Sequence, residues 1–148
     1  MSPTGDLYVC DSGNNRIKVY DKSYQLIKIF GSEGSGNDQL DDPWGLAFTP
    51  TGELLVADYG NYRVKVWTGE GSYIRSIGSK GKGRGQFSRG PVVVAATPDC
   101  HVLVSELWAS RLLMFTLSGD HVRDITPSVP NVQRSIQITD VTVDREGN

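Results

Sequence analysis

A ten-residue segment near the N-terminus occurs again later in the chain with only a few substitutions. Residues 11–20 read DSGNNRIKVY and residues 58–67 read DYGNYRVKVW, 47 positions apart. The similarity extends upstream, because SPTGDLYVCD (2–11) aligns with TPTGELLVAD (49–58) and, 48 positions later, with TPDCHVLVSE (97–106). A repeat of this length indicates a fold built from successive copies of one structural unit.

Each repeat contains several short β-type segments and lacks the periodicity of an amphipathic helix. In the second repeat they are GLAFT (45–49), ELLVAD (53–58), VKVWT (64–68) and YIRSIG (73–78), separated by turns rich in Gly, Pro, Asn and Asp. Four antiparallel strands per about 40–50 residues are typical of one blade of a β-propeller. The sequence therefore predicts an all-β fold of propeller blades.

The alignment also predicts the blade boundaries. Residues 1–42 form blade 1, which lacks its innermost strand, residues 43–90 form blade 2, and residues 91–137 form blade 3. Residues 138–148 begin a fourth repeat, with ITDVTVD (138–144) as an innermost strand. An open arc of three blades leaves unpaired strand edges and apolar faces exposed. We expect a fragment of a longer propeller, or two copies joined head to tail, each lending its last strand to blade 1 of the other.

A recurring polar triad follows the second strand of each blade. An Asp can accept hydrogen bonds from turn N–H groups, Asn tolerates a left-handed turn, and Arg can bind a carboxylate through two bonds. We interpret Asp-x-x-Asn-x-Arg as a clip for the hairpin between the second and third strands. Its members are Asp11, Asn14, Arg16, Asp58, Asn61, Arg63, Glu106 and Arg111, with Ala109 at the Asn position of blade 3.

Three segments resemble the NHL-repeat family: GDLYVCDSGNNRIKVYD, GSGNDQLDDPWGLAFTPTGELLVADYGNYRVKV and GRGQF. The resemblance covers nearly the whole chain and weakens in the third repeat, where Cys100 replaces the turn glycine and P-W-G becomes P-V-V. It implies a six-bladed β-propeller, of which this chain holds about three blades' worth. It also implies a recognition or scaffold role, as in the C-terminal propellers of tripartite-motif (TRIM) proteins, which often carry a RING ubiquitin-ligase module upstream.

One end of the blades collects the side chains best suited to binding. In an antiparallel blade, the loop between strands two and three opens at the same end as the crossover to the next blade. The first crossover is acidic, with Glu33, Asp38, Asp41 and Asp42, and the second is basic. We expect this end to contact a partner through Trp44, Tyr59, Tyr62, Lys80, Lys82, Arg84, Arg89 and Trp108.

Two kinds of partner are compatible with these residues. Aromatic and Arg side chains are enriched at protein–protein hot spots, which favours a protein partner. The basic crossover GSKGKGRGQF beside aromatic rings also suits RNA, and its glycine N–H groups could approach an anion. Some TRIM-type NHL propellers bind RNA, as the resemblance implies, but the net charge of −2 and the acidic crossover oppose a polyanion. Alternatively, these loops are simply solvated.

A second basic column has a structural interpretation. Lys28, Arg75 and Arg123 occupy the same position in the three outermost strands. Cations on an edge strand discourage pairing with another sheet, and we expect that role for them.

The sequence offers little for catalysis. His101 and His121 lack a second ligand at metal-binding spacing, Cys10 and Cys100 suggest neither a zinc site nor a nucleophile, and no phosphate-binding or dinucleotide motif is present. We therefore expect no metal, no cofactor and no enzyme in this segment, with a lactonase-like metal-dependent hydrolase as the alternative. No signal peptide or membrane-spanning run is evident, and a cytoplasmic location is expected.

Overall fold

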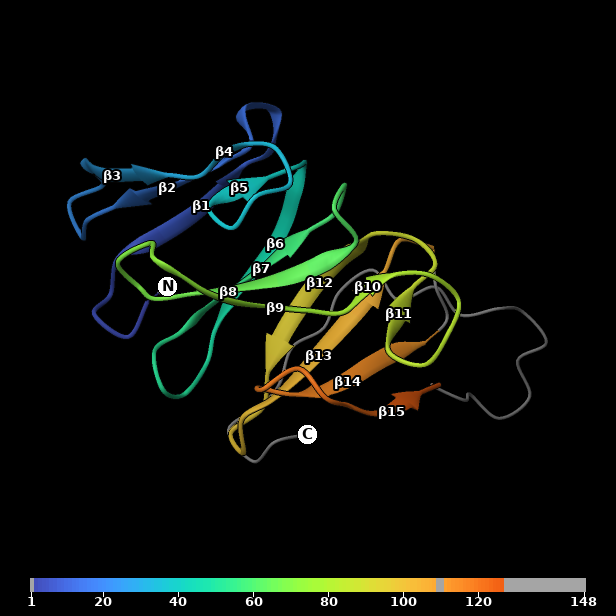
Figure 1. Ribbon diagram of the computed structural model, residues 1–148. Helices are drawn as coiled ribbons and strands as arrows, with labels where there is room; N and C mark the ends of the chain where they lie inside the picture. Colours follow the sequence, from blue (N-terminus) through green and yellow to red (C-terminus); the bar gives the residue numbers. More distant parts are fainter. Residues whose placement is uncertain (1, 109–110, 127–148) are drawn as a thin grey trace.

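The computed structural model describes residues 2–108 and 111–126, and these form successive antiparallel sheets arranged side by side (Figure 1). Blade 1 has three strands, β1 (Leu7–Asp11), β2 (Arg16–Tyr20) and β3 (Leu26–Phe30). Blade 2 has four, β6 (Pro43–Phe48), β7 (Leu54–Asp58), β8 (Arg63–Trp67) and β9 (Tyr73–Ile77). Blade 3 also has four, β12 (Pro91–Ala96), β13 (His101–Glu106), β14 (Leu112–Thr116) and β15 (His121–Ile125).

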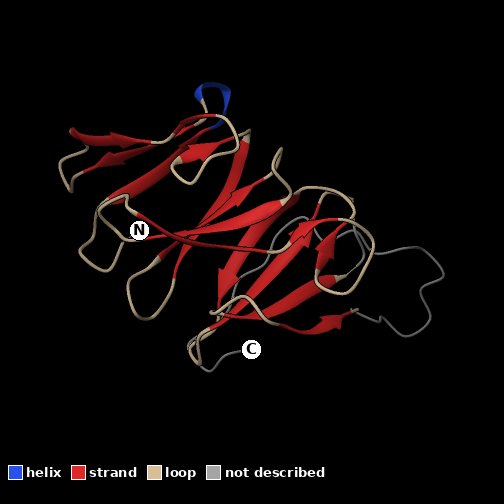
Figure 2. Cartoon of the chain, in the orientation of Figure 1, coloured by secondary structure: helices blue, strands red, loops and turns tan. Residues whose placement is uncertain are grey.

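The all-β blade architecture predicted from the repeat is confirmed (Figure 2). The sheet of each blade keeps the order of its strands along the chain and pairs them antiparallel. One turn of 3-10 helix, η1 (Ser12–Asn14), lies in the hairpin after β1. The expected innermost strand 138–144 lies outside the described residues.

Both crossovers between blades contain a short parallel pair of strands that the sequence pattern did not predict. Crossover 1, residues 31–42, pairs β4 (Ser32–Glu33) with β5 (Gln39–Leu40). Crossover 2, residues 78–90, pairs β10 (Ser79–Lys80) with β11 (Gln86–Phe87). Each pair closes a glycine-rich arch into a defined loop.

Alternation along each strand divides the core into two layers between neighbouring blades. Val64 and Val66 of β8 face blade 3, whereas Trp67 belongs to the cluster shared with blade 1. The innermost strands approach each other closely, because a Cβ on Gly45 would lie 2.5 Å from the carbonyl oxygen of Val92. Blade 2 is thus buried on both faces, as a central blade requires.

Blade 1 has an apolar face without a neighbour among the described residues. Val9 is 38% exposed, whereas Val56 at the same position of blade 2 is 0% exposed. Leu26 and Ile29 of β3 are also exposed. This face has the composition of a blade interface rather than of a solvated surface.

The basic column on the outermost strands has contacts that differ from the expected edge protection. Lys28 Nζ donates to a carboxylate oxygen of Glu70 at 2.5 Å and to its carbonyl oxygen at 3.3 Å. Arg75 Nε donates to the carbonyl oxygen of Leu117 at 2.6 Å. Lys28 and Arg75 therefore each tie the outermost strand of one blade to a turn of the next, because that turn presents acceptors within reach.

The turns before the second strands share one backbone conformation. Gly5 has φ +91° and Gly52 has φ +87°, in the left-handed region that favours glycine. In blade 3 the same position is Cys100, with φ +63°. The third repeat thus keeps the turn geometry while having lost the residue best suited to it.

Candidate partner-binding surface

The hairpins and the crossovers meet at one end of the blades, which we call the loop end (Figure 1). The Gly60 amide, in the β7–β8 hairpin, donates to the carbonyl oxygen of Asp41 in crossover 1 at 2.8 Å. Lys80 Nζ, in crossover 2, lies 4.5 Å from the centroid of the Tyr62 ring. The strand directions predicted this shared end, and the structure brings the two sets of loops into contact there.

Aromatic side chains at the loop end are partly exposed. The Trp44 and Tyr59 rings lie 5.7 Å apart between centroids, and Trp44 is 49% exposed. Its indole Nε1 donates to Asp42 at 3.0 Å. Trp108 is 62% exposed, with φ +59°. Large aromatic surfaces held in place by a polar contact are typical anchors in protein interfaces.

The four basic residues of crossover 2 carry charges that no carboxylate neutralises in the described part of the chain. Lys80, Lys82, Arg84 and Arg89 are exposed, and the salt bridges among residues 2–108 and 111–126 involve none of them. Lys80 is held over Tyr62, and Arg84 leans toward β15, where its Nε donates to His121. Arg84 is thus directed away from Lys80, toward blade 3.

The acidic residues of crossover 1 also lie at the loop end. Glu33, Asp38 and Asp41 are exposed, and Asp42 is half-buried with φ +48°. The loop end therefore presents adjacent regions of opposite charge rather than one continuous basic surface.

Two glycine amides of crossover 2, those of Gly81 and Gly83, are used within the loop, which differs from the expectation that they approach an anion. Gly81 N donates to the carbonyl oxygen of Phe87 at 2.9 Å, and Gly83 N donates to Gln86 Oε1 at 2.9 Å. In crossover 1, Gly36 N donates likewise to Gln39 Oε1 at 3.0 Å. In each arch a glutamine side chain therefore accepts from a glycine amide of the same loop.

The hairpin triads form networks around their acidic residues. In blade 1, Asn14 Nδ2 and Arg16 Nε each donate to Asp11 at 2.8 Å. The pKa of Asp11 lies well below its ordinary value because Lys18, then Asn14 and Arg16, donate hydrogen bonds to its carboxylate. Lys18 belongs to this network although the triad pattern does not include it.

The blade 2 triad is buried and reaches crossover 1. Asp58 is 0% exposed and accepts from Arg63 Nε at 2.8 Å and from the Asp41 amide at 2.7 Å. Asn61 Nδ2 donates to Asp58 and to the carbonyl oxygen of Gly34. The triad therefore connects a hairpin to a crossover, beyond fixing the hairpin itself.

The blade 3 triad is looser. Arg111 Nη2 lies 3.4 Å from the Glu106 carboxylate, while Arg111 Nη1 lies 2.5 Å from Asp124. Glu106 instead accepts from the Arg89 amide at 2.8 Å and from Ser88 at 3.2 Å. Ala109 lies outside the described residues.

This end also contains a buried lysine that the sequence pattern did not predict. Lys65 is 0% exposed, and its Nζ lies 5.7 Å from the Trp67 ring centroid and 5.5 Å from that of Tyr73. The ammonium donates to three main-chain carbonyls of crossover 1, those of Gly36, Asn37 and Gln39. Burial, and next the charge of Arg63, lower the pKa of Lys65 to about 8. The sequence does contain one indication of this role, because Lys18 and Lys65 occupy the same position in two aligned strands.

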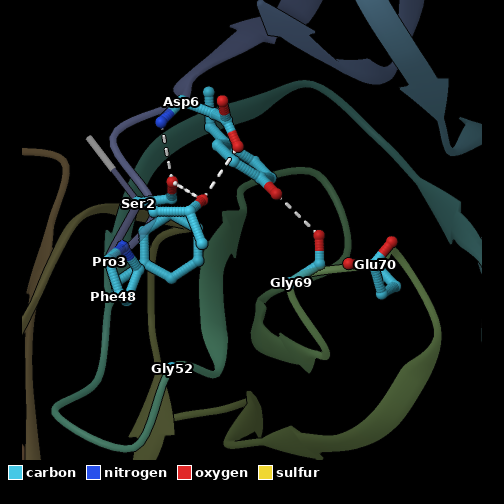
Figure 3. A pocket seen from close by; sticks show the side chains of 9 residues that line it. Ser2, Pro3, Asp6, Phe48, Gly52, Gly69 and Glu70 are labelled. Atoms are coloured by element: carbon cyan, nitrogen blue, oxygen red, sulfur yellow. Dashed lines mark hydrogen bonds between the residues drawn. The ribbon is translucent and has the colours of Figure 1, made fainter. Parts of the chain in front are cut away.

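A pocket lies at the opposite end of the blades (Figure 3). Its volume is about 360 Å³, and Tyr8 OH donates there to the carbonyl oxygen of Gly69 at 2.6 Å. Burial raises the pKa of Tyr8. Thr4 donates to Asp6 at 2.8 Å, so several polar groups of this pocket are already bonded to one another. No sequence motif pointed to it. Its lining residues are Ser2, Pro3, Thr4, Asp6, Tyr8, Phe48, Gly52, Gly69 and Glu70.

Each histidine contacts an aspartate of its own. His101 Nδ1 lies 3.0 Å from Asp99 and His121 Nε2 lies 2.8 Å from Asp124. Within residues 2–108 and 111–126, no three His, Cys, Asp or Glu side chains gather so that they could hold a metal ion. In the same part of the chain, no helix has the length and apolarity needed to cross a bilayer.

This geometry defines a module of consecutive β-propeller blades. Residues 1–20 and 40–67 match the model of the NHL repeat. A stretch of 43 residues is 44% identical to "RING finger protein nhl-1" of Caenorhabditis elegans, covering 29% of this chain and 4% of that protein. The first two repeats of this chain are therefore similar to the NHL repeat.

Solved structures share the blade architecture. A catalytically inactive virginiamycin B lyase from Staphylococcus aureus, determined with quinupristin, superposes with a TM-score of 0.63 at 19% identity, over 87% of this chain and 40% of that one. A streptogramin B lyase gives 0.64 at 16% identity, over 90% and 40%. At these identities the likeness shows the fold alone. The chain spans less than half of each of these relatives.

Proposed function

We propose that this chain is a non-catalytic recognition module whose loop end binds a protein partner. The observation that carries the proposal is the exposure of Trp44 and Trp108 at the end where the cations of crossover 2 lack carboxylate partners among the described residues. Exposed aromatics beside available charges suit a protein hot spot. The adjacent acidic crossover suits a partner of mixed charge better than a uniform polyanion.

Comparative capture tests this proposal. Proteins that bind the chain would be compared with those that bind Trp44→Ala and Trp108→Ala variants, and the dissociation constant of a purified candidate would then be measured. Because hot-spot truncations cost about 2 kcal/mol or more, we expect at least about a 30-fold weaker affinity. Ile74→Ala, at a residue 37% exposed on the outermost strand of blade 2, serves as the control. Equal binding by all variants would overturn the proposal.

The role in ubiquitin transfer rests on family likeness. The relative named "RING finger protein nhl-1" matches over a short segment, and we infer that this chain likewise recognises partners for a ligase module elsewhere in its parent protein. Ubiquitination of a captured partner that requires Trp44 and Trp108 would support this inference. Unchanged modification of that partner by a parent carrying both alanine variants would contradict it.

RNA is the second candidate, favoured by the unneutralised cations of crossover 2. If RNA binds, affinity falls steeply as salt rises and collapses when Lys80, Lys82 and Arg84 are changed to Glu. A protein partner held by aromatics depends only weakly on salt. Filter binding of single-stranded RNA at two salt concentrations separates these outcomes. A lactonase-like hydrolase would instead retain a divalent cation on purification, which elemental analysis detects.

We also infer that the exposed apolar face of blade 1 receives another blade. Lys18, Arg16 and Asn14 stand where Lys65, Arg63 and Asn61 hold crossover 1 against blade 2. A blade from a longer chain or from a second copy would satisfy this face. Light scattering decides between them for the isolated chain, because a mass of 16.2 kDa excludes the head-to-tail dimer.

A further inference from the structure

Arg84 and His121 make a side-chain contact that links crossover 2 to the outermost strand of blade 3. Arg84 Nε lies 3.0 Å from His121 Nδ1, and His121 Nε2 lies 2.8 Å from Asp124 Oδ1. The imidazole is largely buried, with 13% of its side chain exposed, and packs against the edge of Phe115 at 5.7 Å between centroids. The histidine is therefore held by one partner at each nitrogen.

The two partners specify the protonation state of this ring. A guanidinium only donates hydrogen bonds, so Nδ1 must accept and carry no proton. Burial opposes ionisation of Asp124, but the hydrogen bond from His121 and the charge of Arg111 outweigh it and lower the pKa of Asp124. An ionised carboxylate only accepts, so Nε2 carries the proton. His121 is consequently the neutral Nε2–H tautomer when both contacts are made.

We infer that His121 is a proton-controlled latch on Arg84, closed when the imidazole is neutral and opened when it is protonated. A proton on Nδ1 would place two N–H donors against each other and two positive charges within contact distance. The contact with Asp124 would persist, because a charged imidazole still donates to it. Arg84 is therefore the partner that leaves.

The other charges around the ring leave this outcome in place. Arg111 Nη1 lies 2.5 Å from Asp124, and Arg111 Nη2 lies 3.4 Å from Glu106. Asp124 is thus shared with a second cation, and within residues 2–108 and 111–126 no salt bridge joins Arg84 to either carboxylate. The other acceptor near Arg84 is the carbonyl oxygen of Val122, 3.5 Å from Nη2. When His121 becomes charged, Arg84 has no acid of its own at this site.

The repeat explains why the latch belongs to crossover 2. In blade 2, Lys65 holds the carbonyls of crossover 1. In blade 3, the aligned position is Leu113, which is buried and cannot donate. Arg84 and His121 supply a polar tie where the lysine is missing. This tie, unlike three main-chain acceptors around an ammonium, depends on an imidazole nitrogen that accepts only while it carries no proton.

An NMR titration tests the latch on the chain as it is, without a partner. We expect the Arg84 Nε–H signal to be protected at pH 8 and lost in parallel with the titration of His121. Arg84→Met removes the opposing cation, so the pKa of His121 should rise by about half a unit or more. Asp124→Asn removes the favourable charge and should lower it by a similar amount.

Internal controls accompany the titration. Lys82→Met removes a cation of the same loop that does not contact His121, and it should leave the pKa of His121 unchanged. None of the variants should change the titration of His101. If the pKa of His121 is the same in Arg84→Met as in the unchanged chain, or if Arg84 Nε–H protection ignores the His121 titration, the latch does not exist. Only its consequence, acid-controlled presentation of Arg84 at the loop end, rests on the proposed function. Failure of partner binding therefore leaves the latch itself measurable.

Discussion

Replacing Cys100 by glycine should stabilise this chain. Cys100 has φ +63° in the turn before β13, where blades 1 and 2 have glycine at φ +91° and +87°. A side chain in the left-handed region costs roughly 1–2 kcal/mol. Glycine also makes the unfolded chain more flexible, which lowers the free energy of unfolding by about 0.4–1 kcal/mol. We expect a net gain of about 0.5–1 kcal/mol, which for a chain of this size raises Tm by about 1–4 °C.

The reciprocal change isolates the backbone effect. A Cβ added at Gly52 would meet nothing within 4 Å, so Gly52→Ala introduces strain without a steric clash. It should destabilise the fold by about 1–2 kcal/mol. Gly13→Ala is the matched control, because its Cβ also meets nothing within 4 Å and its φ is not in the left-handed region.

Urea unfolding followed by tryptophan fluorescence measures all three variants. The midpoint should rise for Cys100→Gly and fall for Gly52→Ala, with the slope m unchanged. The backbone reasoning is refuted if Cys100→Gly lowers the midpoint. It is refuted equally if Gly52→Ala costs no more than Gly13→Ala.

Three further outcomes follow from buried polar groups. Asp58→Ala should lower the free energy of unfolding by about 3 kcal/mol, because it leaves Arg63 without its carboxylate partner beside a buried site. Urea unfolding should show a smaller loss for Asp11→Ala. Because the folded-state pKa of Asp11 is lowered, its contribution to stability disappears as pH falls below the ordinary Asp range. Lys65 has a folded-state pKa of about 8, below its unfolded value, so the folded chain binds fewer protons than the unfolded chain above that pH. The free energy of unfolding should therefore rise from pH 8 toward about 10.4, and Lys65→Met should abolish this rise in the same assay. Burial raises the pKa of Cys10 to about 12, so mass spectrometry should find Cys10 unmodified by iodoacetamide at pH 8 in the folded chain and modified in urea.

The repeat predicted the blades because each strand is short, bounded by turn residues, and present in aligned copies. The number of strands per blade and the missing innermost strand of blade 1 both follow from that alignment and match the structure. The parallel pairs within the crossovers could not be predicted, because segments of two residues such as Ser32–Glu33 are too short to carry an alternation. In each arch a glutamine side chain accepts from a glycine amide three residues before it, a contact that no strand pattern encodes.

The contacts of the loop end were predictable only in part. Alternating strand direction correctly placed the hairpins beside the crossovers. It could not show that Lys65 points into an interface, because a lysine is expected at the solvent-facing positions of a strand unless acceptors are known to lie nearby. It also could not pair Arg84 with His121, which lie 37 residues apart and meet only when crossover 2 folds over blade 3.

The two crossovers have the same backbone design but different anchors, and this difference has a functional consequence. Crossover 1 is held by a buried ammonium with three carbonyl acceptors, a contact that uses none of its acidic side chains. Crossover 2 lies against Leu113 and commits one of its own cations, Arg84, to the neighbouring blade. Because that cation is also among the groups proposed to contact a partner, anchoring and recognition compete for the same side chain in crossover 2. Condition-dependent binding should therefore arise at the second crossover rather than at the first.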